Sequence, residues 1–235
     1  MNYVIWNNKD SRDINGLLIS ELPPITKPKM RVKETVIDGV DGSIIEELGY
    51  ESYDKTILIG LKIGADVDEI SEFFTGSGEI VFSNEPDKYY KATIVNRIDY
   101  ARLLRYKVAQ VTFRVQPFKY NREEVPIEVD GSEGAVWVEN LGNTTAKPII
   151  TIKGREGVDL TADETKLCTV NISLSSYEDD TLVVDSEKQD AYLSDGTLKN
   201  YQMSGNFPIL KKGKTLISWL GRVERIRIEK YSRWL

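Results

Sequence analysis

The feature that most constrains this chain is residues 108–117, where two sets of side chains alternate. One set is Val108, Gln110, Thr112, Arg114 and Gln116, and the other is Ala109, Val111, Phe113, Val115 and Pro117. A period of two is typical of a half-buried β-strand, because successive side chains point to opposite faces of a sheet. We therefore expect one face to lie in a core and the other, polar face to be solvated or to form an interface.

The residues before this run are predicted to complete one β-domain around it. An apolar strand at Ile80–Phe82 leads through a polar turn into a second strand near residues 90–94. Pro117 has no amide hydrogen to donate to a ladder, so we expect the alternating strand to end there. A charged, proline-containing linker follows, and we predict a first domain of residues 1–125.

Residues 29–62 are predicted to form a long hairpin arm in this domain. Alternating strands flank the sequence Gly39-Val40-Asp41-Gly42, and its two glycines favour a tight turn. The tip has too few apolar residues to pack on a core of its own. Two interpretations are open: the arm is solvated, or it clasps a neighbouring subunit, since exposed ladder groups on a hairpin are a template for another chain.

One short α-helix is predicted over residues 66–75. Asp66 is a suitable N-cap, Glu69 follows three residues later, and Gly76 is a typical stop signal. A helix this short is not stable alone in water, so it must pack against the sheet. Its apolar face consists of Val67, Ile70, Phe73 and Phe74.

Residues 126–235 are predicted to form a second β-domain. Short apolar segments alternate with turn signals at a spacing of about 8–12 residues, which is typical of a sandwich or a barrel. We expect turns at Gly154–Gly157 and Tyr177–Asp180, and a break between two strands at Gly221. The predicted fold class is mainly β, with two domains, of which the first also has one helix and the arm.

The composition argues against an enzyme. The chain has no histidine, which removes the commonest general base and metal ligand. Cys168 therefore lacks a histidine partner, and we interpret it as a small buried side chain on a strand. Asp159, Asp163 and Glu164 could offer carboxylates to calcium, but they lack EF-hand spacing. We predict no catalytic residue, no cofactor and no metal.

The charge balance does not indicate a nucleic-acid-binding protein. There are 31 basic and 37 acidic residues, a net charge of −6, and neither half of the chain is basic. The C-terminal basic residues alternate with Glu224 and Glu229, which favours a solvated strand face over a phosphate site. The start of the sequence lacks the pattern of a signal peptide, and no apolar stretch is long enough for a membrane helix. We expect a protein without a membrane partner that is kept inside a cell until release.

Motifs in four places together resemble the distal tail protein (Dit) family of siphophages and prophages of Gram-positive bacteria. The first motif is Gly39–Gly42. The second, Ile80–Ser83 with Pro86–Ala92, follows the predicted helix, and the third, Gln116–Tyr120, closes the first domain. The fourth combines three segments of the second domain: Asn140–Asn143, Lys147–Ile150 and Phe207–Lys214. The family often has arginine where this chain has Val40, and commonly Pro-Gly-x-Asn where Lys212 lies.

This resemblance implies a structural tail-tip, or baseplate hub, protein that forms a hexameric ring. The ring would join the tail tube protein to the tail hub or lysin protein and to baseplate or receptor-binding proteins, and DNA would only pass through it. The second domain would be a galectin-like, jelly-roll type sandwich. The protein would be found in the virion tail, and in the host cytoplasm during assembly.

Two sets of site residues follow from the arm and from the alternating strand. The expected subunit interface is Val36, Asp38, Gly39, Asp41, Gly42, Tyr50 and Tyr53. The expected lumen or ring-contact residues are Gln110, Thr112, Arg114 and Gln116. The alternative function is a carbohydrate-binding, lectin-like module that contacts host cell-surface glycans, because exposed aromatic side chains can stack on sugars. A wall-degrading hydrolase is disfavoured by the missing histidine.

Overall fold

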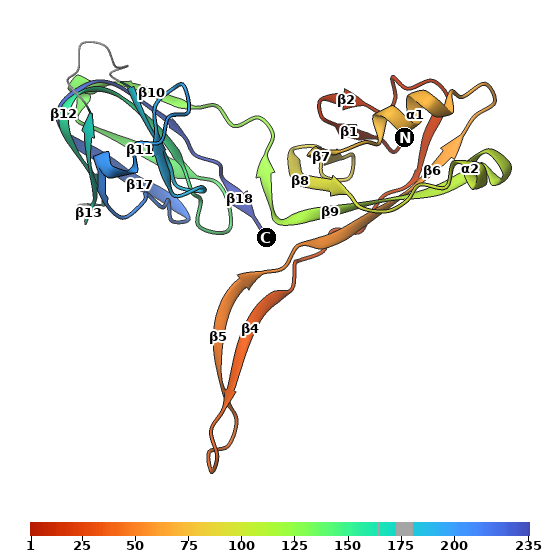
Figure 1. Cartoon of the computed structure of the whole chain (residues 1–235), viewed down its shortest axis with the longest axis horizontal. Coiled ribbons are helices and arrows are strands. Elements are labelled where there is room, and N and C mark those ends of the chain that lie inside the picture. Colours follow the sequence, from red (N-terminus) through yellow and green to blue (C-terminus); the bar gives the residue numbers. More distant parts are fainter. Residues whose placement is uncertain (164, 173–180) are drawn as a thin grey trace. The chain divides into compact units, whose positions relative to one another are not determined.

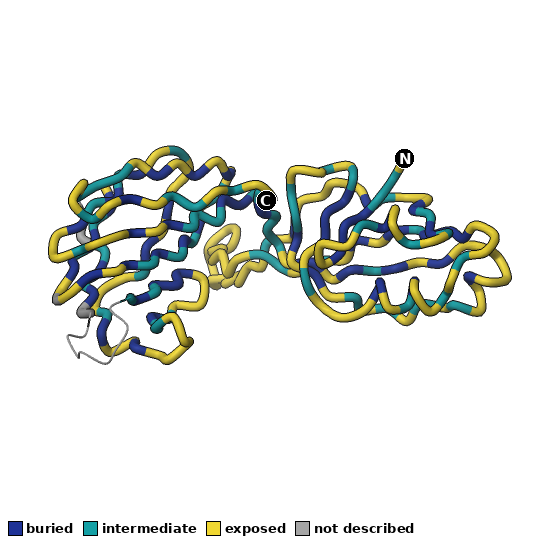
Figure 2. The backbone as a smooth tube through the Cα atoms, turned by 90° about the horizontal axis from the view of Figure 1, so that it is seen from above, coloured by how far each residue is buried: buried dark blue, intermediate teal, exposed yellow. Residues whose placement is uncertain are grey.

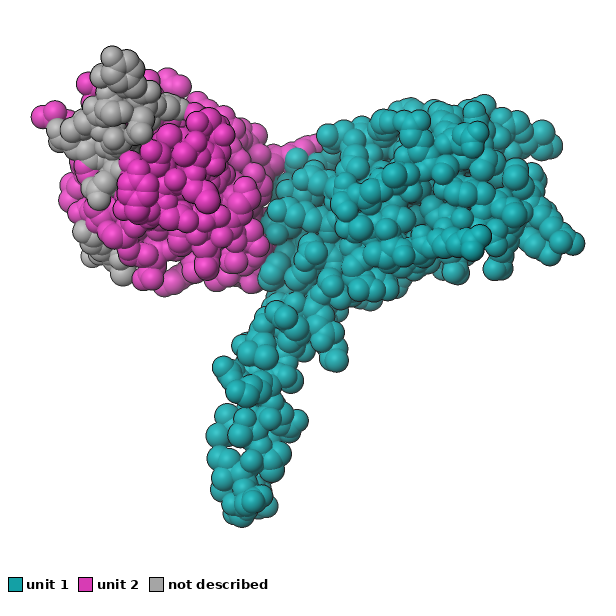
Figure 3. All heavy atoms as spheres, viewed as in Figure 1, with its two compact units in different colours: residues 1–122, 235 teal, residues 123–234 magenta. Residues whose placement is uncertain are grey.

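The chain forms two compact units, which the computed structural model describes over residues 1–163, 165–172 and 181–235. Unit 1 comprises Met1–Arg122 with Leu235, and unit 2 comprises Glu123–Trp234 (Figure 3). Each unit has a separate hydrophobic core, visible as the buried segments of Figure 2. The sequence places the domain boundary a few residues later, at residue 125. Both units are curled, sandwich-like β-domains, which confirms the predicted fold class.

Unit 1 is built on one antiparallel sheet with the strand order β2-β1-β7-β8-β9-β6-β3 (Figure 1). A separate two-stranded sheet, β4-β5, forms the arm. The strands and helices of the unit are β1 (Val4–Trp6), β2 (Lys9–Asp10), β3 (Leu17–Glu21), β4 (Met30–Val36), β5 (Ser43–Tyr50), β6 (Tyr53–Leu61), α1 (Val67–Phe73), β7 (Ser77–Phe82), β8 (Lys88–Ile94), α2 (Tyr100–Tyr106) and β9 (Val108–Asn121).

The alternating run lies in β9, a central strand that pairs with β6 on one side and β8 on the other. Its apolar residues from Ala109 to Val115 are buried, whereas Gln110, Arg114 and Gln116 are exposed. The predicted half-buried strand is therefore confirmed. Phe113 is at the centre of the core, with its ring centroid 5.3 Å from that of Trp6. Phe82 and Phe74 are its other aromatic neighbours.

The expected end of this strand at Pro117 is wrong, because β9 continues to Asn121. The register with β8 shifts between Tyr90, which faces Lys119, and Ala92, which faces Val115. Pro117 lies inside this irregularity, where no regular ladder bond is required from its nitrogen. A bulge is one of the few places where a strand tolerates proline.

Helix α1 packs its apolar face on this core, as predicted. The Asp66 carboxylate caps the helix by accepting hydrogen bonds from the amides of Asp68, at 2.9 Å, and Glu69, at 3.4 Å. Ile70 and Phe73 are buried. The helix itself spans Val67–Phe73, inside the predicted bounds of 66–75, because Asp66 and Phe74 are its capping residues.

Helix α2 is a second helix of unit 1 that the sequence analysis did not predict. Asp99 caps it by accepting a hydrogen bond from the Arg102 amide at 2.9 Å, and Lys107 ends it in a left-handed conformation. Leu103 is the buried residue of this helix. Its contacts with the core are Leu103 and the partly buried Tyr100. Two apolar contacts within seven residues are too few to establish a helical period, so the cap and the helix-forming residues were the remaining signals.

The arm is shorter than the predicted 29–62. Its two strands, β4 and β5, pair from Met30 with Tyr50 to Val36 with Ser43. Residues 53–61 instead form β6, which lies in the main sheet between β3 and β9. The sequence alternates in the same way in the arm and in β6. Only the strand with which each segment pairs shows whether it belongs to the arm or to the main sheet.

A buried polar network lies between β6, β8 and β9. The Lys55 ammonium donates to the Pro24 carbonyl at 2.9 Å and lies 5.0 Å from the centroid of the Tyr90 ring. The Tyr90 hydroxyl donates to Glu85 at 2.7 Å, and Lys119 donates to the other oxygen of the same carboxylate. Burial lowers the pKa of Lys55 to about 8. Burial and the bond to Glu85 raise the pKa of Tyr90.

Lys55 is expected to make the stability of unit 1 depend on alkaline pH. Between its folded pKa of about 8 and its ordinary value, the unfolded chain binds more protons, so the free energy of unfolding rises with pH. Relative to Lys55→Met, the wild type should gain about 2.5 kcal/mol between pH 7 and pH 10. Urea unfolding of both variants at the two pH values measures this difference, in which the titration of other groups cancels. The prediction would be contradicted if the free energy of unfolding changed by the same amount between the two pH values in both variants.

Unit 2 is a second antiparallel sheet system with the strand order β10-β17-β12-β13-β16. In addition, β11 pairs with β17, and β14 pairs with both β12 and β15. The strands of this sheet system are β10 (Ile127–Asp130), β11 (Ala135–Asn140), β12 (Ile149–Ala162), β13 (Thr165–Ile172), β14 (Thr181–Asp185), β15 (Asp190–Tyr192), β16 (Met203–Gly205) and β17 (Gly213–Glu229), with short 3-10 helices at Gly131–Glu133 and Asn200–Gln202. The short strand β18 (Arg233–Trp234) follows them in the chain and does not belong to this sheet system. Cys168 is buried in the core of the unit, as predicted.

Two predicted breaks in unit 2 are wrong. Strand β12 runs through Gly154–Gly157 and β17 runs through Gly221, because their pairing shifts register at these points instead of ending. A Cβ atom on Gly154 would collide with the Arg222 carbonyl, and one on Gly221 with the Gly157 carbonyl. The glycines thus allow close approach of two long strands at a bulge. The turn predicted at Tyr177–Asp180 lies outside the described residues.

Candidate subunit-contact surfaces

The arm exposes apolar side chains on both of its faces. Residues that are opposite each other in the hairpin share a face, as do residues two apart in one strand. Ile45 is opposite Glu34, so it lies on the same face as Val36. Ile44 is opposite Thr35 and lies on the other face. Val36 is 71%, Ile44 60% and Ile45 62% exposed. Such side chains can contact a partner from either side of the arm.

The predicted interface residues divide into two groups. Val36, Asp38, Gly39, Asp41 and Gly42 lie together at the exposed tip. Tyr50 lies at the base of the arm, with its ring 6.0 Å from the Phe118 ring in an edge-on arrangement. Tyr53 is in β6, where it packs against the core, and burial raises the pKa of its hydroxyl. The structure therefore brings the tip residues together and places Tyr50 and Tyr53 away from them.

The predicted lumen residues share one face of β9, and strand pairing extends this polar face onto β6. Arg114 is opposite Asp54 and forms an ion pair with it, which holds the pKa of the Asp54 carboxyl below its usual value. The hydroxyls of Thr112 and Thr56 are 3.0 Å apart. Because these partners belong to β6, only the tertiary structure could identify them.

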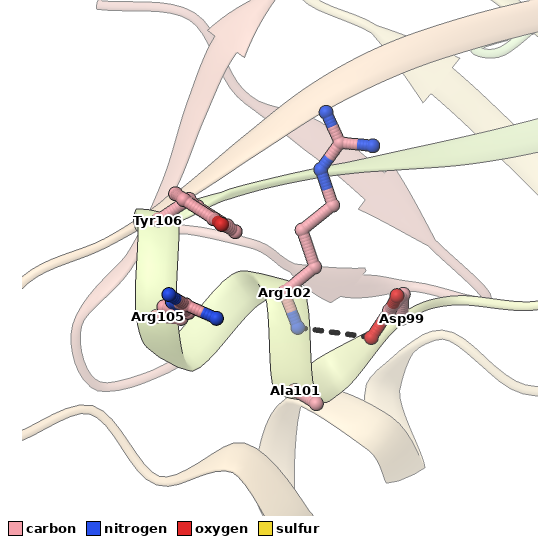
Figure 4. A pocket seen from close by; sticks show the side chains of 5 residues that line it. All are labelled: Asp99, Ala101, Arg102, Arg105 and Tyr106. Atoms are coloured by element: carbon pink, nitrogen blue, oxygen red, sulfur yellow. Dashed lines mark hydrogen bonds between the residues drawn. The ribbon is translucent and has the colours of Figure 1, made fainter.

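Helix α2 forms a basic surface that sequence reasoning missed. Arg102, Arg105 and Tyr106 line a surface pocket together with Asp99 and Ala101 (Figure 4). The Arg105 guanidinium lies 5.2 Å from the centroid of the Tyr106 ring. A neighbouring pocket of about 220 Å³ also includes Arg97 and Gln110. It is smaller than typical small-molecule sites of roughly 300–1,000 Å³.

Two of the three carboxylates considered for calcium, Asp159 and Asp163, accept hydrogen bonds within unit 2. No cluster of acidic, histidine or cysteine side chains suited to a metal occurs in the part of the chain that the structure describes. Asp159 accepts from Thr169, and Asp163 accepts from the Leu216 amide, while Glu164 lies outside the described residues.

In residues 1–163, 165–172 and 181–235, no helix has the length and apolar character needed to span a membrane.

The C-terminal basic residues are largely engaged in ion pairs within unit 2. Arg227 contacts Glu128 at 3.3 Å and Glu229 at 3.1 Å. Lys230 lies 3.6 Å from Glu124. A paired strand face of this kind fits the predicted solvated surface better than a phosphate site.

Unit 2 also exposes an aromatic side chain of the kind that the glycan-binding alternative requires. Trp137 of β11 is 61% exposed and lies opposite Leu216 of β17. An exposed ring alone does not identify a sugar site, because orientation and specificity come from precisely placed polar groups. Glycan binding stays a prediction.

No protein-family model matches the chain, and no curated protein matches it in sequence. A solved structure does match over almost the entire length, namely that of the SPP1 Dit (gp 19.1) protein, described as a paradigm of the hub adsorption apparatus in phages that infect Gram-positive bacteria. The TM-score is 0.69, the sequence identity is 17%, and the match covers 98% of this chain and 99% of the other.

The chain has the Dit fold. The resemblance inferred from the motifs is confirmed at this level, across both units. A chain of the phage p2 baseplate, solved in its activated conformation with Sr, matches with a TM-score of 0.48 and 8% identity over 97% of each chain.

Proposed function

We propose that this chain is a structural protein of a phage tail tip, and that unit 1 assembles into a hexameric ring. The observation that carries the proposal is the full-length match to the fold of SPP1 Dit, whose structure is described as a hub of an adsorption apparatus. A match over both units and the arm is more specific than a match of one sandwich domain, since single β-sandwiches serve many functions.

The exposed arm supports assembly independently of the comparison. Seven large apolar side chains of the arm are between 46% and 71% exposed: Val32, Val36, Ile37, Val40, Ile44, Ile45 and Leu48. Exposed apolar groups concentrated in one place typically mark an interaction site. Their burial by a neighbouring copy would contribute roughly 1 kcal/mol per side chain. The arm is therefore proposed to clasp the next subunit, with the tip residues from Val36 to Gly42 at the contact.

The polar face of β9 is proposed to line the lumen or to contact the ring. Gln110, Thr112, Arg114 and Gln116 offer one cation, and that cation is already paired with Asp54. A surface without an excess of positive charge would not retain the phosphates of passing DNA. The further proposed partners are the tail tube protein, the tail hub or lysin protein, and baseplate or receptor-binding proteins. The proposed locations are the virion tail and, during assembly, the host cytoplasm.

Rings are expected when the full chain is purified and concentrated. Negative-stain electron microscopy should show closed particles with a central hole, and class averages would count the subunits. Mass photometry of the same sample should give a species six times the mass of the chain, 26.7 kDa. A strict monomer at high concentration would overturn the proposal.

A further inference from the structure

The distal arm, defined as residues 34–48, is acidic as well as apolar. It contains no lysine or arginine, and its five carboxylates are Glu34, Asp38, Asp41, Glu46 and Glu47. Lys33, next to this segment, pairs with Glu46 at 3.7 Å, and Glu34 accepts from the Ser43 hydroxyl. A partner surface for the distal arm should therefore combine positive charge with apolar contact area.

The α2 surface has this combination. It comprises four basic residues and three exposed apolar ones: Arg97, Arg102, Arg105 and Lys107 with Leu104, Tyr106 and Val108. The carboxylate of Asp99 adjoins them and caps α2, so the surface keeps an excess of three positive charges. None of the four basic side chains forms an ion pair within the described ranges. Tyr106 is 61% and Leu104 51% exposed. The charge is thus available to another molecule.

The arm and the α2 surface lie at opposite ends of the same pair of strands (Figure 1). Tyr53, which follows the arm, pairs with Val115, whereas Gly60 pairs with Val108, which follows α2. The eight residues of this ladder span about 23 Å. The arm extends away from the sheet, so its tip lies far from the α2 surface of its own chain. Two complementary surfaces at opposite ends of one molecule make a head-to-tail contact, which closes into a ring when the rotation permits.

We propose that the distal arm of one copy docks on the α2 surface of the next copy. The carboxylates of the arm pair with Arg97, Arg102, Arg105 and Lys107, and apolar side chains of the arm cover Leu104 and Tyr106. The docking depends on the proposed ring and identifies the acceptor for its clasp. Charge pairing of this type sets the register and the rate of association more than the total affinity.

Charge reversal on the two surfaces tests the docking. Arg102→Glu/Arg105→Glu and Asp38→Lys/Asp41→Lys should each weaken assembly about ten-fold or more, as measured by sedimentation velocity over a concentration series. Lys211→Glu/Lys212→Glu is the matched control, because it makes the same charge change on exposed residues of unit 2 and should leave assembly unchanged.

A mixture of the two defective variants should assemble again. The arm of Asp38→Lys/Asp41→Lys would carry added positive charge and face the α2 surface of Arg102→Glu/Arg105→Glu, which carries added negative charge. The unchanged acidic arm of Arg102→Glu/Arg105→Glu would face the unchanged arginines of the other variant. Both contacts are restored in an alternating ring with an even number of subunits. Mass photometry of the equimolar mixture should recover the wild-type assembly, and circular dichroism should show that each variant is folded.

Different failures separate the docking from the proposed function. If the wild type forms rings but the mixture does not recover them, or if Arg102→Glu/Arg105→Glu assembles normally, the α2 surface is not the acceptor. If the wild type forms no assembly, the ring itself is wrong.

Fluorescence anisotropy with a labelled DNA duplex adds a third readout. DNA binding that is lost in Arg102→Glu/Arg105→Glu, without loss of assembly, would assign the α2 surface to phosphate and overturn the docking.

Discussion

Replacing residues 34–45 with an Asn-Gly turn should give a folded chain that no longer assembles. The replacement joins Lys33 to Glu46, which are opposite each other in the hairpin, and Asn-Gly is the preferred two-residue hairpin turn. The shortened arm keeps Tyr50 on Phe118 and removes the exposed tip. Because the removed side chains contribute nothing to the core of unit 1, the melting temperature should change little. Sedimentation velocity should show a monomer where the wild type forms rings.

Point substitutions provide the matched control for this deletion. Val36→Ser/Ile45→Ser removes exposed apolar side chains from the arm, whereas Val125→Ser removes one from the start of unit 2, before β10, where it is 75% exposed. The first variant should weaken assembly and the second should not. Rings that persist after the replacement of residues 34–45 would show that the arm is not the clasp.

Glu85→Gln should destabilise unit 1 by about 3 kcal/mol, because removal of one partner from a buried ion pair leaves the other charge uncompensated. The Glu85 and Lys119 side chains are 12% and 14% exposed. The same carboxylate accepts a hydrogen bond from Tyr90 and is the nearby negative charge for Lys55. A loss of this size corresponds to a decrease in melting temperature of roughly 10 °C.

Glu72→Gln is the matched control for the buried pair. Glu72 lies 3.8 Å from Lys9, and both side chains are mostly exposed, so its loss should cost less than about 0.5 kcal/mol. Urea unfolding monitored by tryptophan fluorescence would compare the two variants, because the buried Trp6 reports on the core of unit 1 and the contribution of Trp137, Trp219 and Trp234 is common to both. Equal stability of Glu85→Gln and Glu72→Gln would mean that the buried network has no net stabilising effect.

Part of the site could be predicted from the sequence because it depends on local chemistry. The tip residues Asp38–Gly42 combine turn-forming glycines with charge, which places them on an exposed turn whatever the rest of the fold does. The partners of the polar face could not be predicted, because Asp54 and Arg114 are sixty residues apart and meet only through the pairing of β6 with β9. The α2 surface was missed for a related reason, since α2 is short and contacts the core through only one buried residue, Leu103, and the partly buried Tyr100.

The sequence by itself determined the buried face of β9, the helix that begins after Asp66 and the division into two β-rich halves. Each depends on a short period or a cap within a few residues. Tertiary structure alone decided that β9 continues past Pro117, that Gly154 and Gly221 lie within long strands, and that Tyr53 belongs to the sheet and not to the arm. Strand pairing is the physical reason: the hydrogen-bond partners that continue, shift or end a strand come from distant parts of the chain.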